Sequence, residues 1–208
     1  MSQYLGPIEY LHYMGIECWQ ERAAVSETVS LQDLAYQVSV CEKCSLCKTR
    51  TQTVFSRGNP TASLMIIGEA PGFYEDQQGK PFVDKAGKLL DAMLASIGFR
   101  EEDIYIVNVL KCRPPNNREP ALEEIQACRY YLEQQICSVA PKLILALGRL
   151  AGQFLLGKSD TLSSQRLIKH TFQQIPFFVT YHPDDLLRNP EDKKRAYQDL
   201  LLVKINIQ

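Results

Sequence analysis

Residues 64–90 constrain the fold of this chain more than any other stretch. They open with the apolar run 64–67 before a glycine, which is typical of a buried parallel strand. Glycines and prolines follow closely and let the backbone bend and approach a ligand; they are Gly68, Pro71, Gly72 and Gly79. We expect a helix over residues 85–97. This order of strand, polar loop and helix places ligand-binding groups at the carboxyl end of a strand in an α/β sheet.

The rest of the chain continues this alternation. Beyond the first strand and helix, we expect strands over residues 104–110, 143–147 and 177–180, and helices over 31–38, 122–139, 149–156 and 193–203. Strands separated by helices predict an α/β fold with three layers, α/β/α, around a central four-stranded, mostly parallel sheet. The polar, serine-rich residues 157–174 are expected to form a surface loop or hairpin.

The length of 208 residues suits one sizeable domain with an appendage. We expect residues 30–208 to form the domain and residues 1–29 to form an N-terminal helical extension, in which residues 3–22 are amphipathic. No apolar run is long enough for a membrane span, and the first residues do not resemble a signal peptide. We therefore expect a cytoplasmic protein that does not interact with membranes.

The net charge of −1 argues weakly against a nucleic-acid partner, although a local basic face is compatible with it. The seven cysteines of a cytosolic chain indicate metal binding, catalysis or free thiols before disulfides.

Four of these cysteines are candidates for one metal centre. Cys41 and Cys44 form a Cys-x-x-Cys pair, Cys112 closes the second strand, and Cys128 lies in the following helix. Four thiolates can enclose a [4Fe–4S] cluster or a zinc ion. Residues 113–127 separate the second pair, which disfavours a zinc ribbon without excluding zinc. The alternative is a set of separate buried cysteines.

Three polar residues follow strands of the expected sheet. Glu69 follows the first strand, Asn108 lies late in the second, and His182 follows the fourth. Because the carboxyl ends of parallel strands open on the same edge of a sheet, we expect these three side chains to converge.

Three motifs carry a resemblance to a known family. They are Gly68-Glu69-Ala70-Pro71-Gly72 with Pro81-Phe82-Val83, Cys112-Arg113-Pro114-Pro115-Asn116-Asn117-Arg118, and His182-Pro183 with Leu186-Leu187-Arg188. Together they resemble the iron–sulfur uracil-DNA glycosylases, the fourth family of the uracil-DNA glycosylase superfamily. The resemblance covers about residues 31–201. It implies a monomeric DNA-repair enzyme that flips uracil out of DNA, hydrolyses the N-glycosidic bond and leaves an abasic site for base excision repair.

The resemblance also implies a cofactor. It assigns a [4Fe–4S] cluster to Cys41, Cys44, Cys112 and Cys128. Cys47 and Cys137 have no counterpart in the family motifs, and we interpret them as spare thiols.

The base is expected to bind at the first motif and the second strand. The resemblance identifies Asn108 as the residue that reads uracil, Phe82 as the ring that stacks on it, and Gly68 and Ala70 as further contacts. A carboxamide offers a donor and an acceptor side by side, which matches O4 and N3–H of uracil and not the edge of cytosine. Without the resemblance, the sequence favours a structural role for Asn108 in its strand and a place in the core for Phe82.

The remaining motif residues are expected to act on the bond and on the DNA. The resemblance makes His182 a donor to the base oxygen that gains negative charge. We expect Glu69 or Glu75 to stabilise the positive charge of the sugar or to orient water. The gap left in the DNA is expected to be filled by Leu186, Leu187 or Arg188.

Two alternatives remain open. One is an enzyme of the same superfamily with a shifted base preference, for hypoxanthine or xanthine. The other is a non-catalytic iron–sulfur DNA-binding module associated with a polymerase. The acids Asp84, Asp184 and Asp185 depart from the family pattern near a DNA-facing loop and favour the module. The presence of Glu69, Asn108 and His182 argues against the module and favours an enzyme.

Overall fold

The computed structural model describes residues 29–207. Its sheet has six strands in the order β1-β3-β2-β4-β6-β5. The strands are β1 (Arg57–Gly58), β2 (Leu64–Gly68), β3 (Ile104–Asn108), β4 (Leu143–Leu147), β5 (His170–Phe172) and β6 (Ile175–Thr180). The four central strands are parallel, and the two short edge strands are antiparallel to their neighbours.

The predicted α/β fold with a parallel four-stranded centre is confirmed, and the strand count is corrected from four to six. Strand β1 has only two residues, which is too short for a periodic signal. Strand β5 lies within the polar stretch 157–174 and forms a hairpin with β6. Its turn residues Gln173 and Gln174 adopt positive φ angles of 47° and 69°, as tight hairpin turns require.

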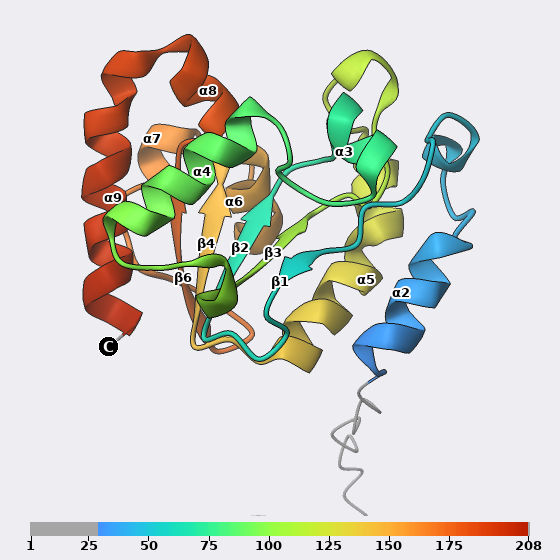
Figure 1. The fold of residues 1–208 in the computed structure, drawn as a ribbon, viewed down its shortest axis with the longest axis horizontal. Helices are drawn as coiled ribbons and strands as arrows, with labels where there is room; N and C mark the ends of the chain where they lie inside the picture. The colour runs from blue at the N-terminus through green and yellow to red at the C-terminus, as the bar shows by residue number, and fades with distance from the viewer. Residues whose placement is uncertain (1–28, 208) are drawn as a thin grey trace, which may run out of the picture.

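Helices flank the sheet on both faces (Figure 1). The helices are α2 (Leu31–Ser39), α3 (Phe73–Gln78), α4 (Lys85–Ser96), α5 (Leu122–Val139), α6 (Gly148–Leu156), α7 (Leu162–Gln165), α8 (Pro183–Arg188) and α9 (Lys193–Ile207). Short 3-10 turns are η1 (Ser45–Lys48), η2 (Glu101–Asp103), η3 (Pro115–Asn117) and η4 (Pro190–Asp192). The last helix extends beyond the predicted end at residue 203, and α3 replaces part of the predicted polar loop.

The alternation of side chains along β2 builds two cores. Leu64 and Ile66 pack in the layer that contains the apolar residues of α4 and α9. Met65 and Ile67 pack in the opposite layer, with residues of α5 and α6. All five residues of β2 are buried, as expected for a strand covered on both faces. The sheet is therefore the middle of three layers.

The parallel strands end at the upper edge of the molecule in Figure 1, and the loops that follow them meet there. Glu69 follows β2 directly, Asn108 ends β3 in register with Gly68, and His182 precedes α8. Arg149 lies in the first turn of α6, immediately after β4. The topology thus brings polar residues from four strand ends to one edge.

Helix α2 packs against α5 beside the sheet. Leu34 and Val38 form a small core with Tyr131, and the Ser138 hydroxyl donates to the Val29 carbonyl at 3.0 Å. The predicted helix over residues 3–22 lies outside the described residues, so the N-terminal extension stays a prediction. Within residues 29–207, no helix is both long and apolar enough to cross a membrane.

Candidate active site

A cavity of about 530 Å³ opens at the carboxyl edge of the sheet. Its walls come from the loop after β2, the loop before α5, the start of α6 and the start of α8. The lining includes Glu69, Ala70, Pro71, Gly72, Glu75, Phe82, Asp84, Pro114, Asn117, Arg118, Arg149, His182, Asp184, Asp185 and Arg188. Of the three side chains predicted to converge, Glu69 and His182 line this cavity, whereas Asn108 does not.

Glu69 lies at the amino end of α6. Its Oε1 accepts a hydrogen bond from the Leu150 N–H at 3.1 Å. A side chain at Gly148 would have no room, because a Cβ there would lie 2.5 Å from Glu69 Oε1. Burial raises the pKa of Glu69, while the neighbouring His182 and the Leu150 N–H oppose that rise. The carboxylate is held in a fixed position between His182 and the helix terminus.

His182 lines the cavity. It precedes α8, and its Nδ1 accepts from the Asp184 N–H at 3.3 Å. A neutral imidazole whose Nδ1 is an acceptor carries its proton on Nε2. Its side chain is only 16% exposed, and its ring lies 5.7 Å from the ring of Phe82. The cap geometry thus selects the tautomer with an Nε2–H donor.

Phe82 is held in an unusual backbone conformation. Its φ angle is +55°, and its N–H donates to Glu75 Oε1. Its carbonyl packs so closely on α4 that a Cβ at Gly87 would lie 1.8 Å from the oxygen. Its ring packs against Gly68, where a Cβ would lie 2.7 Å from Cζ. Two glycines therefore make room for Phe82 in the wall of the cavity.

The buried side chain of Glu75 holds the segment between β2 and α4 in place. Its two oxygens accept from the backbone N–H groups of Gly72, at 2.8 Å, and of Phe82. Burial raises the pKa of this carboxyl to about 7, although the two hydrogen bonds lower it. Both carboxylate oxygens are engaged by the backbone, so these contacts favour a positioning role. The predicted role of Glu75 on the sugar side stays a prediction.

Asn108 is the least satisfied polar residue of this region. Its side chain is 1% exposed, and among residues 29–207 neither Oδ1 nor Nδ2 has a hydrogen-bond partner. The carboxamide lies one layer beneath the cavity lining, where a Cβ on Gly68 would be 2.3 Å from Oδ1 and the Phe82 ring is adjacent. An unpaired buried amide costs roughly 1–3 kcal/mol. Such a group indicates a partner that comes from outside the chain.

The predicted cysteine set lies near this site. Cys112 and Cys128 are buried together with Leu46 and Leu110, and Cys44 packs against them. Burial is the main cause that raises the pKa of Cys128, and the thiols of Cys44 and Cys41 add to it. The four thiols therefore lie within electrostatic range of one another. In the described part of the chain, no group of three or more His, Cys, Asp or Glu side chains is close enough for one metal ion.

Cationic side chains accompany these thiols. Arg50 Nη1 donates to Cys112 Sγ at 3.1 Å and to the Cys41 carbonyl at 2.8 Å. Lys111 is fully buried between Cys112 and Asn108, and its Nζ donates to the Asn108 carbonyl at 2.6 Å. Burial lowers the pKa of Lys111 to about 7 and raises the pKa of Cys112 to about 11, so Arg50 is the cation that favours a thiolate at Cys112. Cysteines gathered around one small core, one of them bonded to a guanidinium, are a donor set that fits an anionic metal centre.

Comparison with known proteins agrees with this geometry. The family model for the uracil DNA glycosylase superfamily matches residues 55–203. The chain belongs to the uracil-DNA glycosylase superfamily. It is 43% identical to a type-4 uracil-DNA glycosylase of Archaeoglobus fulgidus, over 82% of this chain and 89% of that protein. Type-4 uracil-DNA glycosylases of Sulfurisphaera tokodaii and Saccharolobus solfataricus are 40% and 42% identical, each over 84% of this chain and over 84% and 85% of their own lengths.

The acids that depart from the uracil-DNA glycosylase pattern have structural contacts. Asp84 is the N-cap of α4, and its Oδ1 accepts from the N–H groups of Ala86 and Gly87 at 2.9 and 3.2 Å. Asp185 pairs with Arg188 at 2.5 Å. These contacts give both acids a structural role.

The prediction that Leu186 contacts DNA is wrong for this structure. Leu186 is fully buried because α8 directs it toward α4 and α9, where it lines a groove with Met93 and Leu200. Its two neighbours are exposed. Leu187 is 40% exposed, and the side chain of Arg188 is 71% exposed. Of the three predicted DNA-contacting residues, these two remain candidates.

The sequence reasoning missed Asp76, Lys111 and Arg149. Asp76 is buried, and its two oxygens accept from the Thr51 N–H at 2.9 and 3.1 Å, which ties α3 to the segment after the first cysteine pair. The charged residue Lys111 at the end of an apolar strand was a usable signal. Asp76 belongs to the first motif of the resemblance, beside Glu75, but its place in the sequence does not indicate that it is buried.

We expect Glu75 to make the stability of the protein depend on pH. Its pKa is about 7 in the folded protein and 4.5 ordinarily, so the folded state binds more protons between these values. The contribution of Glu75 to the free energy of unfolding is therefore full below pH 4.5, falls as pH rises to 7, and loses about 3 kcal/mol in total. Urea unfolding from pH 4.5 to 8 should show a weaker pH dependence for Glu75→Gln. Glu123→Gln, at an exposed position, is the control and should match the wild type. An unchanged pH dependence in Glu75→Gln would contradict this assignment.

Proposed function

We propose that this chain is a uracil-DNA glycosylase that hydrolyses the N-glycosidic bond of uracil flipped out of DNA. The observation that carries the proposal is the unpaired, buried carboxamide of Asn108 beside Gly68 and Phe82. The names of relatives 40–43% identical over most of the chain support it. The product is an abasic site, the entry to base excision repair.

Asn108 would select the base. Its Nδ2 would donate to O4 of uracil and its Oδ1 would accept from N3–H, which satisfies both orphaned atoms. Cytosine would place its amino donor against Nδ2 and its bare N3 acceptor against Oδ1, so neither hydrogen bond could form. Because Asn108 is buried and does not line the cavity, an entering base would reach the carboxamide only after the cavity wall shifts, and it would then stack on the Phe82 ring.

His182 and Glu69 would stabilise the two charges that develop as the bond breaks. Negative charge gathers on the base oxygens, where the Nε2–H of His182 would donate. Positive charge gathers on the sugar, where the Glu69 carboxylate would stabilise it or orient the attacking water. Both groups line the cavity, and each makes a hydrogen bond with a backbone N–H that holds it in place, which lowers the reorganisation needed in the transition state. Glu75 would act by holding the loop.

We further propose that Cys41, Cys44, Cys112 and Cys128 hold a [4Fe–4S] cluster. When bound, the cluster supplies a cross-link among the end of α2, the end of β3 and α5. Arg50, which donates to Cys112 Sγ, would balance part of the charge of the thiolates. The monomeric state and the cytoplasmic location stay predictions.

An assay of base release from oligonucleotides separates two alternatives. A shifted base preference predicts release of hypoxanthine or xanthine from matched oligonucleotides in place of uracil. A non-catalytic module predicts binding without release of any base. The fixed positions of Glu69 and His182 around the cavity favour an enzyme.

The first test is release of uracil from an oligonucleotide, read as strand cleavage after alkali. We expect the wild type to cleave and His182→Ala to be about 10²–10³ slower in single turnover, because one donor to the developing charge is lost. DNA binding should change little. His170→Ala removes the imidazole outside the cavity and serves as the control. A wild type that releases no uracil would refute the function, and a His182→Ala variant at the wild-type rate would refute its role.

The second test concerns base choice. We expect Asn108→Asp to relax the discrimination against cytosine, because a carboxyl cannot present the donor and acceptor of the carboxamide in the same fixed arrangement. The measurement is the ratio of single-turnover rates on uracil and cytosine oligonucleotides. Uracil selectivity and rate equal to the wild type in Asn108→Asp would remove Asn108 from the site.

The third test concerns the cofactor. We expect protein purified without oxygen to be brown and to contain about four irons per chain. Cys112→Ala should lose iron, whereas Cys137→Ala, outside the matched motifs, should retain it. Colourless protein with one zinc per chain would contradict the cluster, and iron analysis distinguishes the two results.

A further inference from the structure

Two neighbouring aromatic side chains of α3 are exposed to solvent. Phe73 is 49% and Tyr74 59% exposed, and their rings form a T-shaped pair with centroids 5.4 Å apart. The guanidinium of Arg113 lies over the Phe73 ring at 5.0 Å. Single exposed aromatics are common, but a paired set with a stacked cation indicates a binding surface. We call Phe73, Tyr74 and Arg113 the aromatic platform.

The platform is mounted on a rigid support. On the buried side of α3, Glu75 and Asp76 hold the backbone N–H groups of three separate residues, Gly72, Phe82 and Thr51. Arg113 is held from its other side, because its Nε donates to Asn117 Oδ1 at 2.7 Å. The rings therefore face solvent from a fixed element, so a bound partner would meet a surface that is already ordered.

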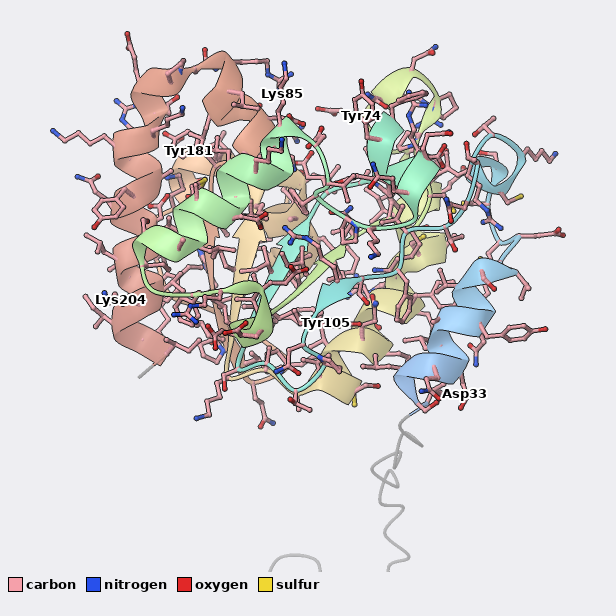
Figure 2. All side chains as sticks on the ribbon, in the orientation of Figure 1. Asp33, Tyr74, Lys85, Tyr105, Tyr181 and Lys204 are labelled. Atoms are coloured by element: carbon pink, nitrogen blue, oxygen red, sulfur yellow. The ribbon has the colours of Figure 1, made fainter. Side chains whose placement is uncertain are left out.

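The platform adjoins the cavity. Gly72, the residue before α3, lines the cavity, and so do Pro114, which follows Arg113, and Asn117, which accepts a hydrogen bond from it. Figure 2 shows Tyr74 at the upper edge of the molecule, the edge at which Lys85 also projects. A DNA strand with one nucleotide in the cavity would therefore have its neighbouring nucleotides near Phe73 and Tyr74.

We propose that the aromatic platform stacks an unpaired base of single-stranded DNA next to the uracil. This inference rests on the proposed function for the position of the uracil. Ring faces stack on any base, and a guanidinium suits both a base face and a phosphate, so the chemistry fits single-stranded DNA without sequence preference. In a duplex the neighbouring bases remain stacked and paired, and their faces are not available to the platform. The platform therefore favours uracil in single strands.

The test is binding of short oligonucleotides with one uracil, measured by fluorescence anisotropy under conditions too brief for turnover. We expect the double variant Phe73→Ser with Tyr74→Ser to bind the single strand about 10-fold or more weakly, and to bind a duplex of the same sequence like the wild type. Tyr36→Ser is the matched control, because Tyr36 is a 69% exposed aromatic on α2 and lies outside the cavity lining. Tyr74→Trp should retain binding, since it keeps a stacking face.

A series of abasic spacers locates the stacked base. Replacing one neighbour of the uracil by a spacer should weaken the wild type and leave the double variant unchanged at that position. Three results would overturn the platform. The double variant could bind the single strand as tightly as the wild type does, or it could lose binding to the single strand and the duplex equally. The third such result is a wild type that does not bind single strands. Platform-dependent binding by a wild type that releases no uracil would support the platform and refute only the proposed function.

Discussion

The buried carboxylate of Glu75 orders the loop on which the cavity depends. By accepting from Gly72 and Phe82, it joins the two ends of a segment that otherwise carries no sheet hydrogen bonds. This bond and the absence of a side chain at Gly87 accommodate the left-handed backbone of Phe82. The position of the Phe82 ring, and with it the access to Asn108, follows from one carboxylate that does not itself need to touch substrate.

Hydrogen bonds connect the cysteine region to the residues around the cavity. Asp76 bonds the backbone of Thr51, and Arg50 beside it bonds both Cys41 and Cys112. On the other side, Lys111 bonds the carbonyl of Asn108 and lies next to Cys112 in the chain. Hydrogen bonds therefore connect the cysteine region both to α3 and to the backbone of Asn108, the residue proposed to read the base.

The sequence predicted the parts of the molecule that follow from periodicity and strand order. The parallel centre of the sheet was readable because apolar runs such as 64–67 recur between helical segments, and the parallel order then brought Glu69 and His182 together. The edge strands were not readable, since β1 has two residues. The burial of Leu186 depends on the direction of α8, and the burial of Asp76 on a partner in a distant loop; no local pattern encodes either.

Gly148 has a further consequence. Its φ of +86° suits glycine, and any Cβ would meet the carboxylate of Glu69 and the Cβ of His182. A lineage in which position 148 gained a side chain would have to shorten the acid at position 69 at the same time. Positions 69 and 148, far apart in the chain, are therefore expected to change together during divergence, and a homologue with a larger residue at 148 should carry a different group where this chain has its glutamate.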